Sequence, residues 1–194
     1  MPTPLLRDEA WDLLTEWVES ESLRKHCLAV EASMRAVARE RGGDEELWGV
    51  TGLLHDIDYE RFPDLETGHP RKALELLEAR DADPLLINAV AAHAPYLGVE
   101  PESEMARALL AVDELSGFVM AVAYVRPQGI HGMTPKSVKK KLKTPAFAAA
   151  VSREDVARGP EHLGMELDDL IRLVIGALEA EAEALGIAGA ADPA

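Results

Sequence analysis

Four histidines and two aspartates in the first part of the chain could together bind metal. In chain order they are His26, His55, Asp56, His69, His93 and Asp113. Neutral imidazole and carboxylate are good ligands for first-row divalent cations. Each residue falls in the middle or at the end of a predicted helix, among apolar neighbours, so packing of the helices would bury it. Because a bound cation offsets the cost of burying such groups, the six residues predict a site for one or two ions.

The adjacent pair His55 and Asp56 limits how such a site could be built. Neighbouring residues on a helix point about 100° apart, so their side chains do not normally meet. Near the end of a helix, both can reach the same ion, or Asp56 can lie between two ions. The sequence is compatible with either arrangement.

The first two ligands lie on predicted helices with clear boundaries. Apolar residues at spacings of three or four predict an amphipathic helix over residues 22–41, which contains His26 and ends at Gly42-Gly43. Asp44 can cap a second helix that begins at residue 45 and ends near His55-Asp56. An irregular stretch follows the second helix.

The next two histidines flank two shorter predicted helices. His69-Pro70 lies at the start of a helix over residues 71–80, because proline is tolerated in a first helical turn. Asp83-Pro84 repeats this start signal, and Pro95 ends the helix soon after His93. Both histidines are therefore placed at helix ends.

The rest of the chain is predicted to be helical as well. The segments cover residues 102–125, which Ser116-Gly117 could bend, and residues 135–143, 152–159 and 167–178. No segment shows sustained alternation of apolar and polar residues. The predicted fold class is all-α, with one helical domain over residues 1–186 and a flexible tail at 187–194.

His26, the doublet His55-Asp56 and Asp113 resemble the ligand signature of the HD superfamily of metal-dependent phosphohydrolases, which are all-helical proteins. The additional His69 and His93 resemble the binuclear branch of that superfamily. The resemblance covers residues 20–125 and implies an HD-type helical bundle, followed by a basic segment and C-terminal helices at 126–186. The sequence departs from the HDIGK version of the motif after the doublet, where Asp58 and Tyr59 replace its Gly and Lys.

The resemblance also implies roles for the ligands. Asp56 would bridge a first ion to a second one bound by His69 and His93. The ligands of the first ion would be His26, His55, Asp56 and Asp113. The cofactors would be one or two divalent ions from the group Fe, Mn, Co, Ni, Zn and Mg.

The implied activity is hydrolysis of a phosphoric ester or anhydride by metal-activated water. The expected substrate is a small phosphorylated metabolite, such as a nucleotide. Asp56, Asp58 and Glu114 are the predicted catalytic residues, since the last two could orient a ligand or accept a proton. Asp58 and Glu114 could equally be solvated charges at helix ends. His131 and His162 do not fit the ligand pattern and are predicted to be loop or surface residues.

Two other functions use the same ligands. Some binuclear HD proteins are di-iron oxygenases, and oxygen uptake by the iron-loaded protein would identify this class. A non-catalytic regulatory protein that binds metal or a nucleotide is the third possibility, and tight binding without turnover would identify it.

A basic segment stands out in a chain that is otherwise acidic. Between Glu114 and Glu154 there is no acidic residue. Lys136, Lys139 and Lys140 lie on a predicted helix in this segment and are predicted to bind substrate phosphate. The alternative is a solvated helix whose lysines pair with acidic neighbours.

The overall composition restricts the partners. The chain has 194 residues, with 20 Lys and Arg against 35 Asp and Glu, which gives a formal charge of -15. This charge makes nucleic acid an unlikely partner and argues against binding to anionic membranes. The single Cys27 excludes an internal disulfide, and no long apolar run predicts a membrane span. We therefore expect a cytoplasmic protein whose oligomeric state is unknown.

Overall fold

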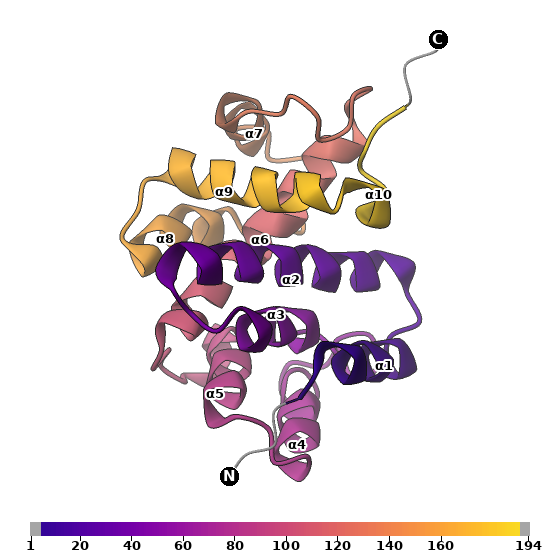
Figure 1. Cartoon of the computed structure of the whole chain (residues 1–194), viewed down its shortest axis with the longest axis vertical. Coiled ribbons are helices and arrows are strands. Elements are labelled where there is room, and N and C mark those ends of the chain that lie inside the picture. The colour runs from indigo at the N-terminus through magenta and orange to yellow at the C-terminus, as the bar shows by residue number, and fades with distance from the viewer. Residues whose placement is uncertain (1–4, 191–194) are drawn as a thin grey trace.

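The structure is a computed structural model of the chain, and it describes residues 5–190 (Figure 1). Within these residues the regular elements are helices and no strand is present, which confirms the predicted all-α class. The helices are α1 (Arg7–Trp17), α2 (Glu21–Arg41), α3 (Glu45–Leu54), α4 (Arg71–Ala79), α5 (Pro84–Ala92), a 3-10 helix η1 (Pro95–Leu97), α6 (Glu104–Tyr124), α7 (Pro135–Leu142), α8 (Arg153–Leu163), α9 (Leu167–Ala180) and α10 (Ala182–Leu185).

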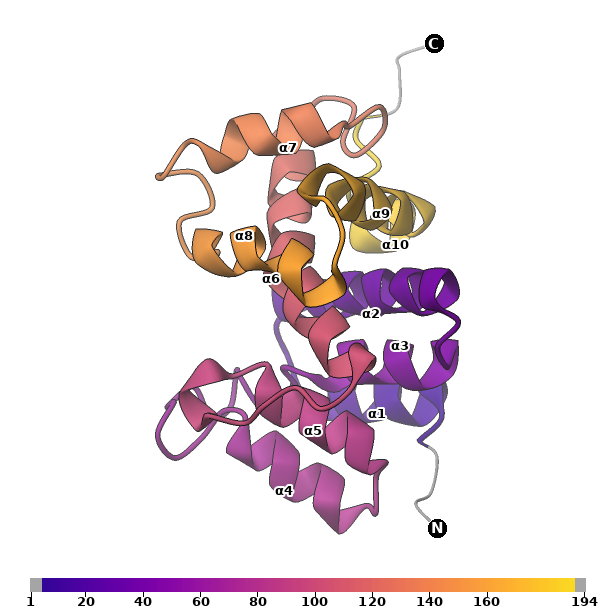
Figure 2. The ribbon, with the colours of Figure 1, turned by 90° about the vertical axis from the view of Figure 1, so that its left-hand side faces the viewer.

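Two long helices, α2 and α6, form the centre of the bundle. Helix α2 packs against α3 on one side and α9 on the other, and it also contacts α6 (Figure 1). Helix α6 runs between the two ends of the molecule, where it contacts α5 at one end and α8 and α9 at the other (Figure 2). Phe118, Leu109 and Leu115 of α6 are fully buried in the core. Residues on α2 and α6 are therefore held in fixed positions.

The boundaries of the first helices follow from local chemistry. The Ser20 hydroxyl accepts a hydrogen bond from the backbone N–H of Leu23 and caps α2, and Gly42 ends this helix with a φ of 70°. The Asp44 carboxylate caps α3 in the same way. The predicted ends of α2 and α3 are confirmed, and helix α1 is an element that the sequence analysis did not identify.

Helix α6 is continuous through Ser116-Gly117, where the sequence allowed a bend. One predicted helix end does not occur. Helix α8 does not end near Gly159 but continues to Leu163. A Cβ atom at Gly159 would lie 2.9 Å from the backbone oxygen of Ala111, so this glycine allows α8 to approach α6 closely and is part of the helix contact.

The prediction of a flexible tail is wrong for residues 187–190. The Ile187 side chain is buried, and its carbonyl oxygen accepts a hydrogen bond from the backbone N–H of Ile130 at 2.8 Å. The backbone N–H of Ala190 donates to the Pro127 carbonyl. Burial of an apolar side chain thus attaches this segment to the 127–130 turn, and residues 191–194 lie outside the described part.

Among residues 5–190, no helix is both long enough and apolar enough to cross a bilayer.

Candidate metal centre

The fold brings all six predicted ligands to one place. His26 lies near the start of α2, and Asp113 lies in the middle of α6. His55 and Asp56 directly follow α3, and His93 directly follows α5. His69 is the last residue of the loop before Pro70, the N-cap of α4. The ends of three helices and the sides of two others therefore meet at one point.

Four of these side chains form a first group of converging ligand atoms. The Nε2 atoms of His26 and His55 lie 3.3 Å apart, and Asp113 Oδ1 lies 3.0 and 3.3 Å from them. Asp56 Oδ2 lies 3.8 Å from His26 Nε2 and 3.6 Å from His55 Nε2. Metal bonds of these atoms are about 2.0–2.2 Å long, so ligand atoms bound to one ion lie roughly 3 Å apart. The spacing of the group fits a single cation.

A second group forms on the other side of Asp56. Asp56 Oδ1 lies 3.5 Å from His69 Nε2 and 3.4 Å from His93 Nε2. The two oxygens of one carboxylate thus face two different sets of imidazole nitrogens. Of the two arrangements open to the doublet, the geometry matches the one in which Asp56 lies between two ions.

The opposite ring nitrogens of two of these histidines donate hydrogen bonds to backbone carbonyls, as is typical of metal ligands. His55 Nδ1 lies 2.7 Å from the Gly52 carbonyl oxygen, and His93 Nδ1 lies 2.5 Å from that of Val90. Because a carbonyl can only accept, each Nδ1 carries a proton, and Nε2 is the atom that can bind a cation once it is deprotonated. These residues therefore fit bound cations without a change of side-chain orientation.

Asp58 lies behind the cluster and accepts a hydrogen bond from one of the candidate ligands. Its side chain is fully buried. Its Oδ1 accepts a hydrogen bond from His69 Nδ1 at 2.7 Å, and its Oδ2 accepts one from the backbone N–H of Ala73 at 2.8 Å. Both oxygens are thus engaged away from the pocket, so the predicted role as a proton acceptor in catalysis does not fit, whereas the role of orienting a ligand does.

Asp58→Asn tests this orienting role. We expect the affinity of the second ion to fall about 10- to 100-fold, because such hydrogen-bond partners fix the direction and basicity of a ligating imidazole. Titration of the metal-free protein with Mn²⁺ measures the change. Asp64→Asn, an exposed acid of the same loop, is the matched control. Equal affinities of the Asp58 variant and the wild type would contradict the role.

The charges within the cluster control its protonation. Burial opposes a charged His55 imidazole, but the neighbouring Asp56 and Asp113 carboxylates outweigh burial and raise its pKa to about 9. Burial likewise opposes ionisation of Asp56 and Asp113, yet the adjacent imidazoles hold the pKa of each carboxyl below its ordinary value. At neutral pH the metal-free cluster therefore contains a protonated His55 between two carboxylates.

Metal binding is accordingly expected to release a proton. Below the His55 pKa of about 9, a cation must displace the proton on Nε2, so its apparent affinity should rise about tenfold per pH unit as the pH increases through neutrality. Calorimetric titration with Mn²⁺ in two buffers of different protonation enthalpy gives the number of protons released. We expect about one proton at pH 7 from this group. Binding that is independent of pH between 6 and 8 would contradict this prediction.

The cluster opens into a pocket of about 390 Å³. The exposed residues Tyr59, which follows α3, and Tyr96, in η1 after α5, border it. Glu114 of α6 borders it as well; burial raises the pKa of this carboxyl, and its Oε2 accepts a hydrogen bond from the backbone N–H of Ser152. No Lys or Arg is present among the described residues that line the pocket.

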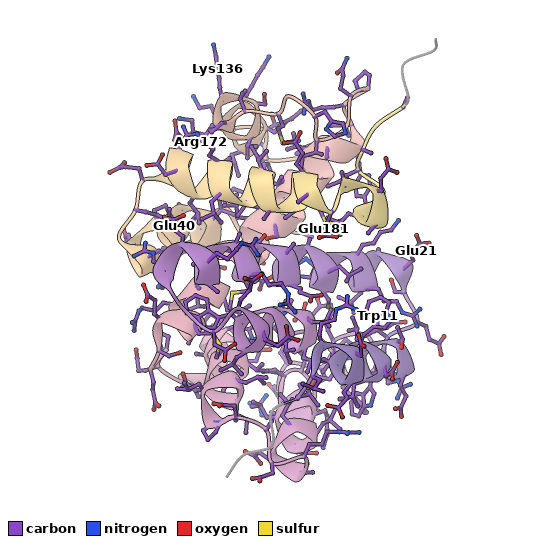
Figure 3. All side chains as sticks on the ribbon, viewed as in Figure 1. Trp11, Glu21, Glu40, Lys136, Arg172 and Glu181 are labelled. Atoms are coloured by element: carbon purple, nitrogen blue, oxygen red, sulfur yellow. The ribbon has the colours of Figure 1, made fainter. Side chains whose placement is uncertain are left out.

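The three predicted phosphate-binding lysines lie elsewhere. Lys136, Lys139 and Lys140 belong to α7, which packs on α6 and α9 at one end of the molecule (Figure 2). Lys136 lies at the outer edge of this end (Figure 3). The Lys139 ammonium lies 2.6 Å from the Asp168 carboxylate. The prediction that they bind substrate at the metal site is wrong, because none of them lines the pocket and the buried Val138 packs α7 on the bundle.

Two residues at the pocket were missed by the sequence analysis. Asp155 and His162 lie on α8 and line the pocket, so His162 is not the loop or surface residue that was predicted. They are seven residues apart and share one helix face. This spacing was hidden because Gly159-Pro160 indicated a helix end.

Comparisons with known proteins identify the family of the chain. The HD domain family matches residues 23–117. A protein named ribonuclease Y from Sulfurovum sp. is 35% identical over 133 residues, or 69% of this chain and 24% of that protein. Ribonuclease Y from Bacillus thuringiensis (strain Al Hakam) is 33% identical over 96 residues, which are 50% of this chain and 18% of that protein. Ribonuclease Y from Campylobacter hominis is 34% identical over 91 residues, which are 47% of this chain and 17% of that protein.

These relatives are much longer proteins, of which the chain spans about a quarter or less. No solved structure shows a significant match to the chain. The match includes the doublet His55-Asp56 and ends four residues after Asp113. Residues 23–117 therefore form an HD domain, and through this domain the chain belongs to the HD superfamily of metal-dependent phosphohydrolases.

Proposed function

We propose that this protein hydrolyses a phosphoric ester or anhydride at a site for two divalent cations. The observation that carries the proposal is the position of Asp56, whose two carboxylate oxygens face two separate groups of histidine nitrogens at 3.4–3.8 Å. When bound, two such ions activate water and neutralise charge on the phosphoryl oxygens. The metal-binding roles of the six residues are part of the proposal.

The surrounding residues support this chemistry in distinct ways. Asp58 holds the His69 ring in position, and the carbonyls of Gly52 and Val90 do the same for His55 and His93. These contacts keep the Nε2 atoms aimed inward. Rigid placement of this kind lowers the reorganisation that a reaction requires. No side-chain nucleophile is needed.

The pocket favours a small phosphorylated substrate, such as a nucleotide. Its volume of about 390 Å³ lies within the usual range of small-molecule sites. The exposed rings of Tyr59 and Tyr96 could stack on a base at its border. The absence of Lys and Arg among the described lining residues and the net charge of -15 both disfavour a long polyanion.

RNA is the second candidate substrate. The relatives at 33–35% identity are named ribonuclease Y, so the expectation that nucleic acid is an unlikely partner is not supported. A phosphodiester bond could undergo the same attack by water.

A substrate screen tests the proposal. Protein freed of metal and reloaded separately with Mn²⁺, Fe²⁺, Co²⁺, Ni²⁺, Zn²⁺ or Mg²⁺ is assayed with phosphomonoesters, nucleotides and a short RNA, with and without oxygen. We expect metal-dependent release of phosphate or of cleaved RNA that does not require oxygen. Oxygen consumption coupled to turnover would assign the protein to the di-iron oxygenases instead. Tight binding without turnover would indicate a regulatory protein.

A further inference from the structure

We propose that His162 protonates the leaving group of the substrate during hydrolysis, a role that rests on the proposed function of the metal centre. The residue lies outside the segment that matches the HD domain and comes from a helix that follows the domain in the chain. It lines the same pocket as the candidate ligands His69 and His93. Of the histidines that line this pocket, it is the one that does not belong to the ligand cluster.

The imidazole of His162 is available to a substrate. The residue is half-buried, and within residues 5–190 no protein group forms a hydrogen bond or an ion pair with its ring. Two acidic side chains, Asp155 and Glu114, also line this part of the pocket, and their chemistry differs from that of an imidazole. Asp155 is an acceptor when ionised, and Glu114 already accepts a hydrogen bond from the Ser152 backbone. With no Lys or Arg among the described lining residues, His162 is the side chain at this wall that can donate a proton through a ring nitrogen.

The placement of His162 depends on a close helix contact. Asp155, Gly159 and His162 follow one another at spacings of four and three, so they share one face of α8. Gly159 lies against the Ala111 carbonyl oxygen of α6, and a side chain there would not fit. This contact sits one helical turn from His162 and holds α8 beside the part of α6 that carries Asp113 (Figure 2). The fold therefore fixes the imidazole at the wall of the pocket.

The proposed step conserves atoms and charge. Water attacks the phosphorus atom, and the bond between phosphorus and the leaving oxygen breaks. The protonated imidazole of His162 transfers its proton to that oxygen, which leaves as an alcohol. The neutral imidazole then takes up a proton from solvent. The proton lost by the attacking water is released to solvent. Overall, one ester and one water give one alcohol and one phosphate.

The test compares two esters that differ in their need for protonation. The p-nitrophenolate of p-nitrophenyl phosphate leaves without a proton, whereas the alkoxide of benzyl phosphate requires one. We expect His162→Ala and His162→Gln to lower kcat on benzyl phosphate about 100-fold while leaving kcat on p-nitrophenyl phosphate within about twofold. KM and bound metal should not change. His131→Ala is the matched control, since His131 is exposed and pairs with Glu179.

A binding measurement provides a second readout. In Zn²⁺-loaded protein with isotope-labelled histidine, inorganic phosphate should shift the His162 ring signals and leave those of His131 unchanged. Three results would overturn the proposal while leaving the proposed function in place. They are an equal loss of kcat on both esters in the His162 variants, wild-type kcat in His162→Gln, and His162 ring signals that do not shift when phosphate is added. A wild-type protein that hydrolyses neither ester in any metal form would overturn both.

Discussion

Asp56→Ala is expected to lower phosphoester hydrolysis by about 10⁴-fold, the largest effect of any single substitution in this chain. One carboxylate supplies an oxygen to each of the two groups of histidines, so its removal weakens both sites at once. The second group would retain only His69 and His93, too few ligands to hold an ion firmly. Steady-state kinetics and metal analysis of the purified variant measure the two effects.

The control for this variant is Asp12→Asn, which changes an exposed carboxylate on α1. It should retain wild-type activity and metal content. Circular dichroism establishes that the Asp56 variant is folded. If Asp56→Ala keeps two ions per chain and more than a tenth of the activity, the bridging role is contradicted.

His93→Ala is expected to leave one ion per chain and to lower activity about 10³-fold, because several kcal/mol of transition-state stabilisation depend on the second ion. His93 contributes to the second group only. The first group keeps all of its ligands, so the affinity of the remaining ion should match that of the wild type. This separates the variant from Asp56→Ala, in which that affinity also falls.

Calorimetric titration with Mn²⁺ resolves the two binding events. His131→Ala serves as the matched histidine substitution, since its ring lies outside the pocket and pairs with Glu179. Loss of both ions in His93→Ala would show that the two sites do not bind independently. Retention of two ions would remove His93 from the ligand set.

Much of the architecture could be predicted because local signals agree with the final packing. The cap Asp44 and the left-handed Gly42 lie where the sequence indicated the start of α3 and the end of α2. These boundaries place His26 on α2 and His55 beside the end of α3. Helix ends depend on a few nearby residues, so they are readable without tertiary information.

Features that depend on contacts between distant segments could not be predicted. The Asp56 oxygens face imidazoles that come from α2, the end of α3, the loop before α4 and the end of α5. Gly159-Pro160 is a strong local stop signal, yet its contact with α6 keeps α8 helical and brings His162 to the pocket. The charge pattern likewise identified the lysines of α7 as a basic surface but contained no information on which end of the bundle that helix covers.

Anomalous X-ray diffraction from crystals of the Mn²⁺-loaded protein would locate the bound ions and show whether Asp56 lies between two of them. We expect two peaks about 3.5–4 Å apart with Asp56 between them. One should lie among His26, His55 and Asp113, and the other beside His69 and His93. A single peak that Asp56 does not contact, or no peak at these residues, would contradict this expectation.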